Sequence, residues 1–219
     1  MAQHLEHELE RIKKMICTLG AQVDESLELA IKSIQKKDAE LAEKVIKKDQ
    51  VIDQMEVELE EECLKALALY QPVAIDLRFI ISVMKMTSDL ERIGDLAADI
   101  AKNGRAINAL PQPKIPLDFH QMSYLTKCIV RKSLDALINL DPYLAREIIK
   151  DDEEINALKT EMKTEIIQAL QRDPEHAELL ITHLAISHRL ERIGDHASNI
   201  AEDVIYMLEA EIVRHRSEV

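Results

Sequence analysis

The hexapeptide LERIGD occurs twice in the chain, at Leu90–Asp95 and again at Leu190–Asp195. Both copies lie in long stretches whose apolar residues recur with the period of an α-helix. A glycine inside a helix costs about 0.5–1 kcal/mol relative to alanine. Two acidic residues spaced i, i+4 repel each other and lower helix stability further. A hexapeptide that is unfavourable in a helix and is nevertheless repeated needs an explanation other than helix propensity.

The repeat extends well beyond the hexapeptide. Residues 76–101 align with residues 176–201, and most of their differences exchange one apolar residue for another. The segment DAELAEKVIKKDQVID (Asp38–Asp53) likewise parallels DPYLAREIIKDDEEIN (Asp141–Asn156). The chain is therefore a tandem duplication of a three-helix unit. We place the two units at residues 1–112 and 113–219, joined by the proline-rich linker ALPQPKIPLD.

Composition and punctuation predict helices throughout. The chain has four glycines, 47% apolar residues and only 3% aromatic residues, which favours helices with an aliphatic core. The predicted helices cover residues 4–36, 38–69, 76–108, 118–140, 142–171 and 174–214. Asp38, Asp118, Asp141 and Asp173 are expected to cap helix N-termini, the last two before a proline. Because short loops join long helices, the predicted fold is all-α, with two tandem up-down-up three-helix bundles related by pseudo-symmetry.

Charge and cysteine content limit the possible partners and location. The net charge of −13 argues against a nucleic-acid partner, which would require a basic face, and suits metal cations. Three scattered cysteines without a CxxC motif are typical of reduced thiols in a cytosolic protein. No signal peptide is visible, and the longest uncharged run, Ala66–Ile75, is too short to span a bilayer. We therefore expect a cytoplasmic protein without direct membrane insertion.

An acidic stripe runs along the third helix of each unit, opposite its apolar face. The second helix of each unit carries matching acids. The set comprises Asp49, Asp53, Glu91, Asp95 and Asp99 in the first unit, and Asp152, Asn156, Glu191, Asp195 and Asn199, with His188 one turn earlier, in the second.

Two interpretations of this stripe remain open. Acids on a helix surface most often form a solvated face. The stripe is nevertheless repeated, lies on two adjacent helices and lacks interleaved lysines at i+4. An i, i+4 pair of carboxylates directs its oxygens to one point, and hard cations bind such clusters. Gly94 and Gly194 would allow close approach of a neighbouring helix, and Arg92 and Arg192 would pair with nearby acids.

Motifs of common enzyme classes are missing from the sequence. There is no ExxH di-iron signature, glycine-rich phosphate loop, HExxH or GxSxG. The histidines form no defensible pair with a serine or cysteine nucleophile. A binding protein is therefore predicted. The alternative is a metal-dependent enzyme such as a phosphatase or a ferroxidase.

Four segments together resemble the PhoU family, the phosphate-transport accessory proteins and negative regulators of the bacterial phosphate regulon. They are the MxxxxDLERIGDLAADIA, HRLERIGDHASNIAE, KKDQVIDQMEVE and QPVAIDLRFI segments at residues 84–101, 188–202, 47–58 and 71–80. The resemblance implies a cytoplasmic, all-helical, often homodimeric and non-enzymatic adaptor. Its partners would be a phosphate importer's ATPase subunit (PstB-like) and a sensor histidine kinase (PhoR-like), with uptake and signalling lowered when phosphate is plentiful.

The resemblance also implies metal clusters on the acidic motifs, with multinuclear iron or zinc expected and manganese or magnesium as further candidates. Mapped onto this sequence, the ligands would be Asp49, Asp53, Glu91, Asp95, Asp99, Asp152, Glu191 and Asp195, with His188, Asn156 and Asn199 as possible additions. Because two asparagines replace acids in the second unit, its site is expected to bind metal more weakly.

Overall fold

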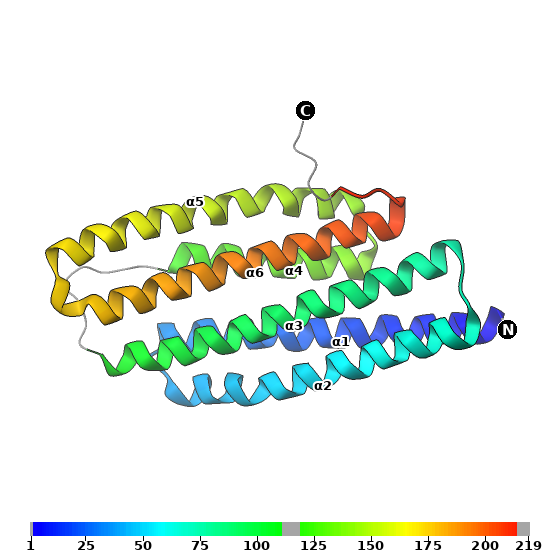
Figure 1. Cartoon of the computed structure of the whole chain (residues 1–219), viewed down its shortest axis with the longest axis horizontal. Coiled ribbons are helices and arrows are strands. Elements are labelled where there is room, and N and C mark those ends of the chain that lie inside the picture. Colours follow the sequence, from blue (N-terminus) through cyan, green and yellow to red (C-terminus); the bar gives the residue numbers. More distant parts are fainter. Residues whose placement is uncertain (1, 111–118, 214–219) are drawn as a thin grey trace.

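The computed structural model describes residues 2–110 and 119–213, and within them the chain forms six α-helices and one short 3₁₀-helix (Figure 1). The elements are α1 (Ala2–Gln35), α2 (Ala39–Tyr70), α3 (Ala74–Ala109), α4 (His120–Asn139), α5 (Pro142–Arg172), η1 (Pro174–His176) and α6 (Ala177–Glu209). The all-helical fold predicted from the sequence is confirmed.

The second helix of each unit begins with the same capping geometry. Asp38 Oδ1 accepts hydrogen bonds from the backbone N–H groups of Glu40 and Leu41 at 2.9 and 3.1 Å. Asp141 Oδ1 accepts the equivalent bonds at the start of α5, also at 2.9 and 3.1 Å. Each carboxylate satisfies two backbone donors that have no partner within the helix. Both predicted caps are confirmed.

The start and the end of the last helix differ from the prediction. Asp173 makes no side-chain capping bond, because its Oδ1 atom lies 2.7 Å from His176 Nδ1. Residues Pro174–His176 form η1, and α6 follows at Ala177. The helix predicted to reach residue 214 ends at Glu209, where Ala210 adopts a left-handed φ of 58°. The predicted cap at Asp118 lies outside the described residues, and α4 begins at His120.

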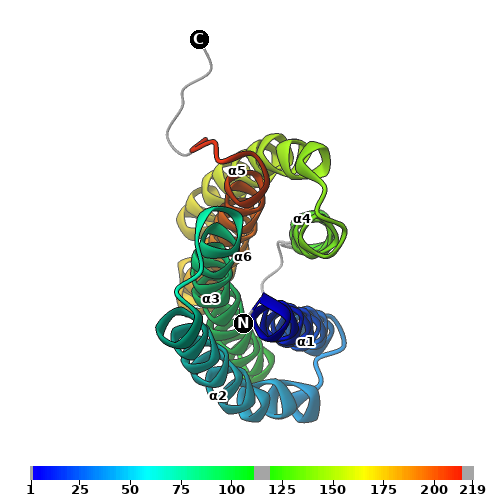
Figure 2. The ribbon, with the colours of Figure 1, turned by 90° about the vertical axis from the view of Figure 1, so that its right-hand side faces the viewer.

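Each unit is an up-down-up arrangement of antiparallel helices (Figure 1). Within the first unit α1, α2 and α3 pack against one another, and α4, α5 and α6 do the same in the second. The units join through α3 against α6 and through α1 against α4. Seen end-on, α2, α3, α6 and α5 form a curved layer, with α1 and α4 on its concave side (Figure 2). The two units repeat the same helix arrangement, as the pseudo-symmetry predicted from the sequence requires.

One aliphatic core runs through both units. Residues from all six α-helices contribute to it, among them the completely buried Ile12, Ile52, Ile93 and Ile193. Burying each such side chain stabilises the fold by roughly 1.5–3 kcal/mol. Because the core continues across the contact between α3 and α6, the two units stabilise each other.

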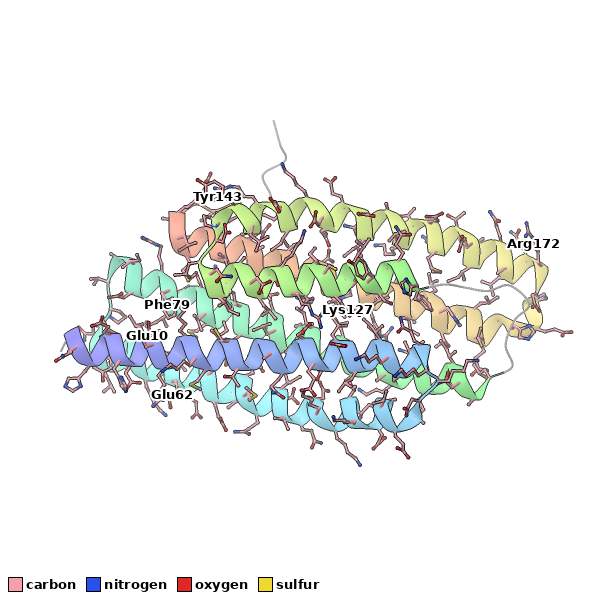
Figure 3. All side chains as sticks on the ribbon, turned by 180° about the vertical axis from the view of Figure 1, so that it is seen from behind. Glu10, Glu62, Phe79, Lys127, Tyr143 and Arg172 are labelled. Atoms are coloured by element: carbon pink, nitrogen blue, oxygen red, sulfur yellow. The ribbon has the colours of Figure 1, made fainter. Side chains whose placement is uncertain are left out.

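Ion pairs also join the two units. Lys85 Nζ on α3 lies 3.5 Å from Asp203 Oδ1 on α6, and Arg189 Nε on α6 lies 3.3 Å from Asp99 Oδ2 on α3. On the side where α1 and α4 lie together (Figure 3), Arg131 of α4 donates to Asp24 of α1 at 2.9 Å. None of the described helices contains an apolar stretch long enough to cross a bilayer.

Candidate metal centre

The two repeated glycines bring neighbouring helices close together. A Cβ atom at Gly94 would lie 3.1 Å from Ile52 Cδ1 on α2. A Cβ atom at Gly194 would lie 2.5 Å from Asp152 Oδ1 and 3.2 Å from Ile155 Cδ1 on α5. The sequence expectation of close helix approach is confirmed. The glycines thus determine how near the acids of one helix come to those of the other.

Three carboxylates of the first unit converge in the groove between α2 and α3, which we call the first groove. Asp49 and Asp53 are one turn apart on α2, and Asp95 faces them from α3. One oxygen from each side chain lies within 4.8 Å of the other two. In the part of the chain that the structure describes, these three aspartates are the histidine, cysteine or acidic side chains that lie close enough together to hold a metal ion.

Asp49 is the electrostatically most unusual member of this group. Burial, followed by the charges of Asp53 and Asp95, raises the pKa of its carboxyl group to about 6. Its Oδ1 atom is inaccessible to solvent and has no hydrogen-bond partner among the described residues. A buried polar atom without a partner costs free energy and calls for an explanation such as an absent ion or water.

Asp152, at the equivalent position on α5, has the same two features. Burial and the charges of Asp195 and Glu191 raise the pKa of its carboxyl group to about 6. Its Oδ1 atom likewise lacks a hydrogen-bond partner among the described residues, while its Oδ2 atom accepts a bond from Asn156 Nδ2 at 3.1 Å. We call the groove between α5 and α6 the second groove. Like the first groove, it contains a buried carboxylate oxygen without a hydrogen-bond partner among the described residues.

Glu91 lies deeper than an outward-facing stripe would place it. Its side chain is only 14% exposed, because α2 covers part of the stripe, so the expectation of a stripe opposite the protein core is corrected at this position. Burial and then the charge of Asp95 raise the pKa of the Glu91 carboxyl group to about 7. Arg92 Nη1 donates to Asp95 Oδ2 at 2.9 Å, which confirms the predicted pairing of this arginine.

Asp99 lies at the edge of the first groove and is held by cations. Arg189 Nε donates to its Oδ2 atom, and Lys102 Nζ lies near its Oδ1 atom, both at 3.3 Å. Its charge still contributes to the raised pKa of Asp49. The structure therefore places Asp99 near the group but in competing ion pairs.

The predicted ligands of the second unit are less well assembled. Lys159 of α5 forms an ion pair with Glu191. Asn199 donates to Asp89 Oδ1 on α3 at 3.2 Å, so its amide is directed towards the other unit. Asp195 keeps part of its surface in solvent, and its partial burial followed by the charge of Glu191 raises the pKa of its carboxyl group. His188 is exposed. Among the described residues, none of these side chains joins a group as close as the one in the first groove.

Sequence reasoning missed two residues that distinguish the grooves. The repeat alignment continues from Asp53 and Asn156 to Glu56 and Lys159, so that an acid in the first unit corresponds to a base in the second. Burial and the neighbouring charges of Glu60 and Asp53 raise the pKa of Glu56, which places it beside the first groove. The signal was available in the printed sequence, one turn beyond the aligned segment.

The first groove has the chemistry of a hard-cation site. Its carboxylates come from two rigid helices and repel one another, and a divalent or trivalent cation would relieve that repulsion while supplying a partner to the orphaned Asp49 oxygen. Iron, manganese and magnesium suit an all-oxygen set, and zinc also accepts carboxylates. The residues therefore fit the metal predicted for this unit.

The whole chain is similar to known proteins. Residues 16–104 and 119–204 each match the sequence model of the PhoU domain. The "Phosphate-specific transport system accessory protein PhoU homolog" of Aquifex aeolicus is 36% identical over 209 residues, which cover 95% of each chain. The homologue from Pseudomonas putida is 34% identical and covers 98% of this chain and 84% of its own length.

Two solved structures share the fold. The crystal structure of PhoU from Pseudomonas aeruginosa superposes with a TM-score of 0.91 at 31% identity, covering 94% of this chain and 99% of the other. The crystal structure of the phosphate transport system regulatory protein PhoU from Streptococcus pneumoniae gives a TM-score of 0.88 at 34% identity, covering 95% and 99%.

Proposed function

Since this chain belongs to the PhoU family of phosphate transport accessory and regulatory proteins, we propose that it is a cytoplasmic negative regulator of phosphate uptake and of phosphate-regulon signalling. The family is regulatory and not enzymatic, so the phosphatase or ferroxidase alternative loses its support. The chain would contact a phosphate importer's ATPase subunit and a sensor histidine kinase, and would lower the activity of both when phosphate is plentiful.

Metal binding in the first groove is the molecular part of this proposal. The observation that carries it is the buried, unpartnered Oδ1 atom of Asp49 beside Asp53 and Asp95. A solvated acidic face would keep its oxygens in water, whereas this oxygen is removed from water without a hydrogen bond in return. Glu91 and Asp99 would complete the set, the latter after release from Lys102. Iron or zinc, in a cluster of more than one ion, is proposed, with manganese or magnesium as substitutes.

The second groove is proposed as a weaker site. Its candidate ligands are Asp152, Glu191 and Asp195, with Asn156, Asn199 and His188 as possible additions. Here Asn156 supplies a neutral group where the first groove has Asp53, so the attraction for a cation is smaller. The orphaned Asp152 oxygen supports a ligand in this groove as well.

Two further parts of the proposal rest on the family. We propose a homodimer, tested by light scattering of the purified protein with and without metal. We also propose that the units at 1–112 and 113–219 are the two functional repeats, and each contains one PhoU-domain match. Their shared core predicts that they unfold together.

The test of the regulatory function is co-purification from the source cell with the importer's ATPase subunit and the sensor kinase. Wild-type protein should capture both, and repeated absence of both would contradict the proposal. Asp49→Asn is the informative variant, because it removes a groove charge with little change in shape. Asp135→Asn is the matched control, because Asp135 is exposed on α4, a helix that contributes no candidate ligand to either groove.

A further inference from the structure

At one position that borders the grooves, α2 and α5 carry opposite charges. Asp49 corresponds to Asp152 and Glu91 to Glu191, but Glu56 of the first groove corresponds to Lys159 of the second. In the first groove, α2 therefore faces α3 with acids on both sides. In the second, α5 brings a single ammonium group to the acids of α6. An arginine stands at the equivalent position of both units, Arg92 and Arg192, and in the first groove Arg92 pairs with Asp95 at 2.9 Å.

Lys159 neutralises one acid of the second groove from within the chain. Its Nζ atom forms an ion pair and hydrogen bond with Glu191 Oε1 across the groove. The two side chains are only 29% and 14% exposed, so the pair is less screened by water than a surface pair. Beside it, the Asn156 amide donates to Asp152, which neutralises a further part of the set. Both contacts supply from within the chain what a metal would supply in the first groove.

We propose that Lys159 acts as an internal cation that replaces the metal ion in the second groove, and that the exchange of Glu56 for Lys159 determines which of the two pseudo-equivalent grooves takes metal first. This inference rests on the proposed metal binding of the first groove. A metal ion entering the second groove must displace Lys159 from Glu191 and then remain near its positive charge. The first groove presents no such competitor from α2.

A consequence is that the two halves of the protein respond differently to metal. At low metal concentration the first groove alone is loaded, and the second is held together by its own lysine. The first groove therefore responds to metal, whereas the acids of the second groove are neutralised by Lys159 at any metal concentration below that needed to displace it. Lys159 is a residue that determines selectivity between the grooves and is not itself a ligand.

The test is a titration with Mn²⁺ alone, in which the signal of free Mn²⁺ is followed by electron paramagnetic resonance. Wild type, Lys159→Gln, Lys159→Glu and Glu56→Lys are compared. Lys163→Gln is the matched control, because Lys163 lies one turn further along α5 and is exposed. Circular dichroism establishes that each variant remains helical before it is titrated.

Lys159→Gln should raise the affinity of the weaker site by about tenfold or more, because one nearby positive charge is removed. Lys159→Glu should make the two sites nearly equal, and Glu56→Lys should weaken the tighter one. An unchanged weaker site in both Lys159 variants, with the tighter site intact, would overturn this inference alone. If wild type bound no Mn²⁺, the first-groove proposal would fail and this inference with it, even if Lys159→Glu gained a site. No binding by any variant would overturn both.

Discussion

Asp152 Oδ1 lies 2.5 Å from the position that a Cβ atom would occupy at Gly194. The carboxylate of α5 therefore rests directly against the backbone of α6, within the second repeated hexapeptide. The same glycine that lowers helix propensity is what gives this acid its place in the groove. The equivalent glycine of the first unit, Gly94, instead faces Ile52, one turn from Asp49.

Gly194→Ala should therefore destabilise the protein although alanine is the better helix former. The new methyl group would collide with Asp152, and overpacking of this kind costs about 1–3 kcal/mol, against a propensity gain of about 1 kcal/mol. Urea denaturation should show a net loss for Gly194→Ala. Gly94→Ala, where the nearest atoms lie 3.1 Å away on Ile52 and the overlap is smaller, should lose less. A clear stabilisation by Gly194→Ala would contradict the close approach.

The metal-free protein should become less stable as pH rises from about 5 to about 7.5. Burial and mutual repulsion raise the pKa of Asp49 to about 6 and of Glu91 to about 7. A folded state with raised acid pKa values binds more protons than the unfolded state in this window, so its free energy of unfolding falls as those protons leave. The lowered pKa values of Glu28 and Glu62 act below about 4.5 and leave the window unaffected.

The pH effect can be measured by denaturation at a series of pH values in the presence of chelator. The double variant Asp49→Asn, Glu91→Gln should reduce the slope, because neither substituted group titrates, while the raised pKa of Asp152 keeps part of it. Asp135→Asn should keep the wild-type slope. If stability changed with pH equally in wild type and in the double variant, the pKa values of Asp49 and Glu91 would not be raised in the folded protein.

Metal should raise the melting temperature of the protein. A cation that binds only the folded state stabilises it by mass action, by about 2.7 kcal/mol when its concentration is 100 times the dissociation constant. Addition of Fe²⁺, Zn²⁺ or Mn²⁺ should shift the melting curve upward, and chelator should reverse the shift. Curves that superimpose with and without all of these ions would favour the solvated-face interpretation.

Metal titration should reveal two classes of site. The first groove has acids where the second has Asn156 and Lys159, so it should fill at lower metal concentration. Asp95→Asn should remove the tighter class and Asp195→Asn the weaker one, as measured by calorimetry. Loss of the tighter class in Asp195→Asn would mean that geometry, and not charge count, sets the order.

Most of the fold was predictable because helix positions and helix ends depend on residues close together in the sequence. The apolar period and the LERIGD repeat predict the helices and their duplication, and Asp38 and Asp141 cap helices as expected. The prediction of a cap at Asp173 was wrong because its carboxylate interacts with His176, three residues later, and does not accept backbone N–H groups. That competition depends on the conformation of η1, which periodicity does not reveal.

The candidate site was only partly predictable. Spacing on a single helix groups Glu91 with Asp95, and the repeat adds Asp49 and Asp53. Whether a side chain turns into the groove or across to another helix depends on tertiary packing. Asn199 therefore contacts Asp89 of the other unit, and Asp99 pairs with Arg189, where helix angles alone would place both over the stripe.

The central claim is that the carboxylates of the first groove hold a metal ion. Its most direct test is metal analysis of the protein purified from its source cell without chelator, compared with Asp49→Asn, Asp53→Asn and the control Asp135→Asn. Wild type and control should retain at least one equivalent of a transition metal, most of which the two groove variants lose while remaining folded. The claim would be contradicted if wild type carried no stoichiometric metal, even after reconstitution with iron, zinc and manganese, or if the groove variants retained as much metal as wild type.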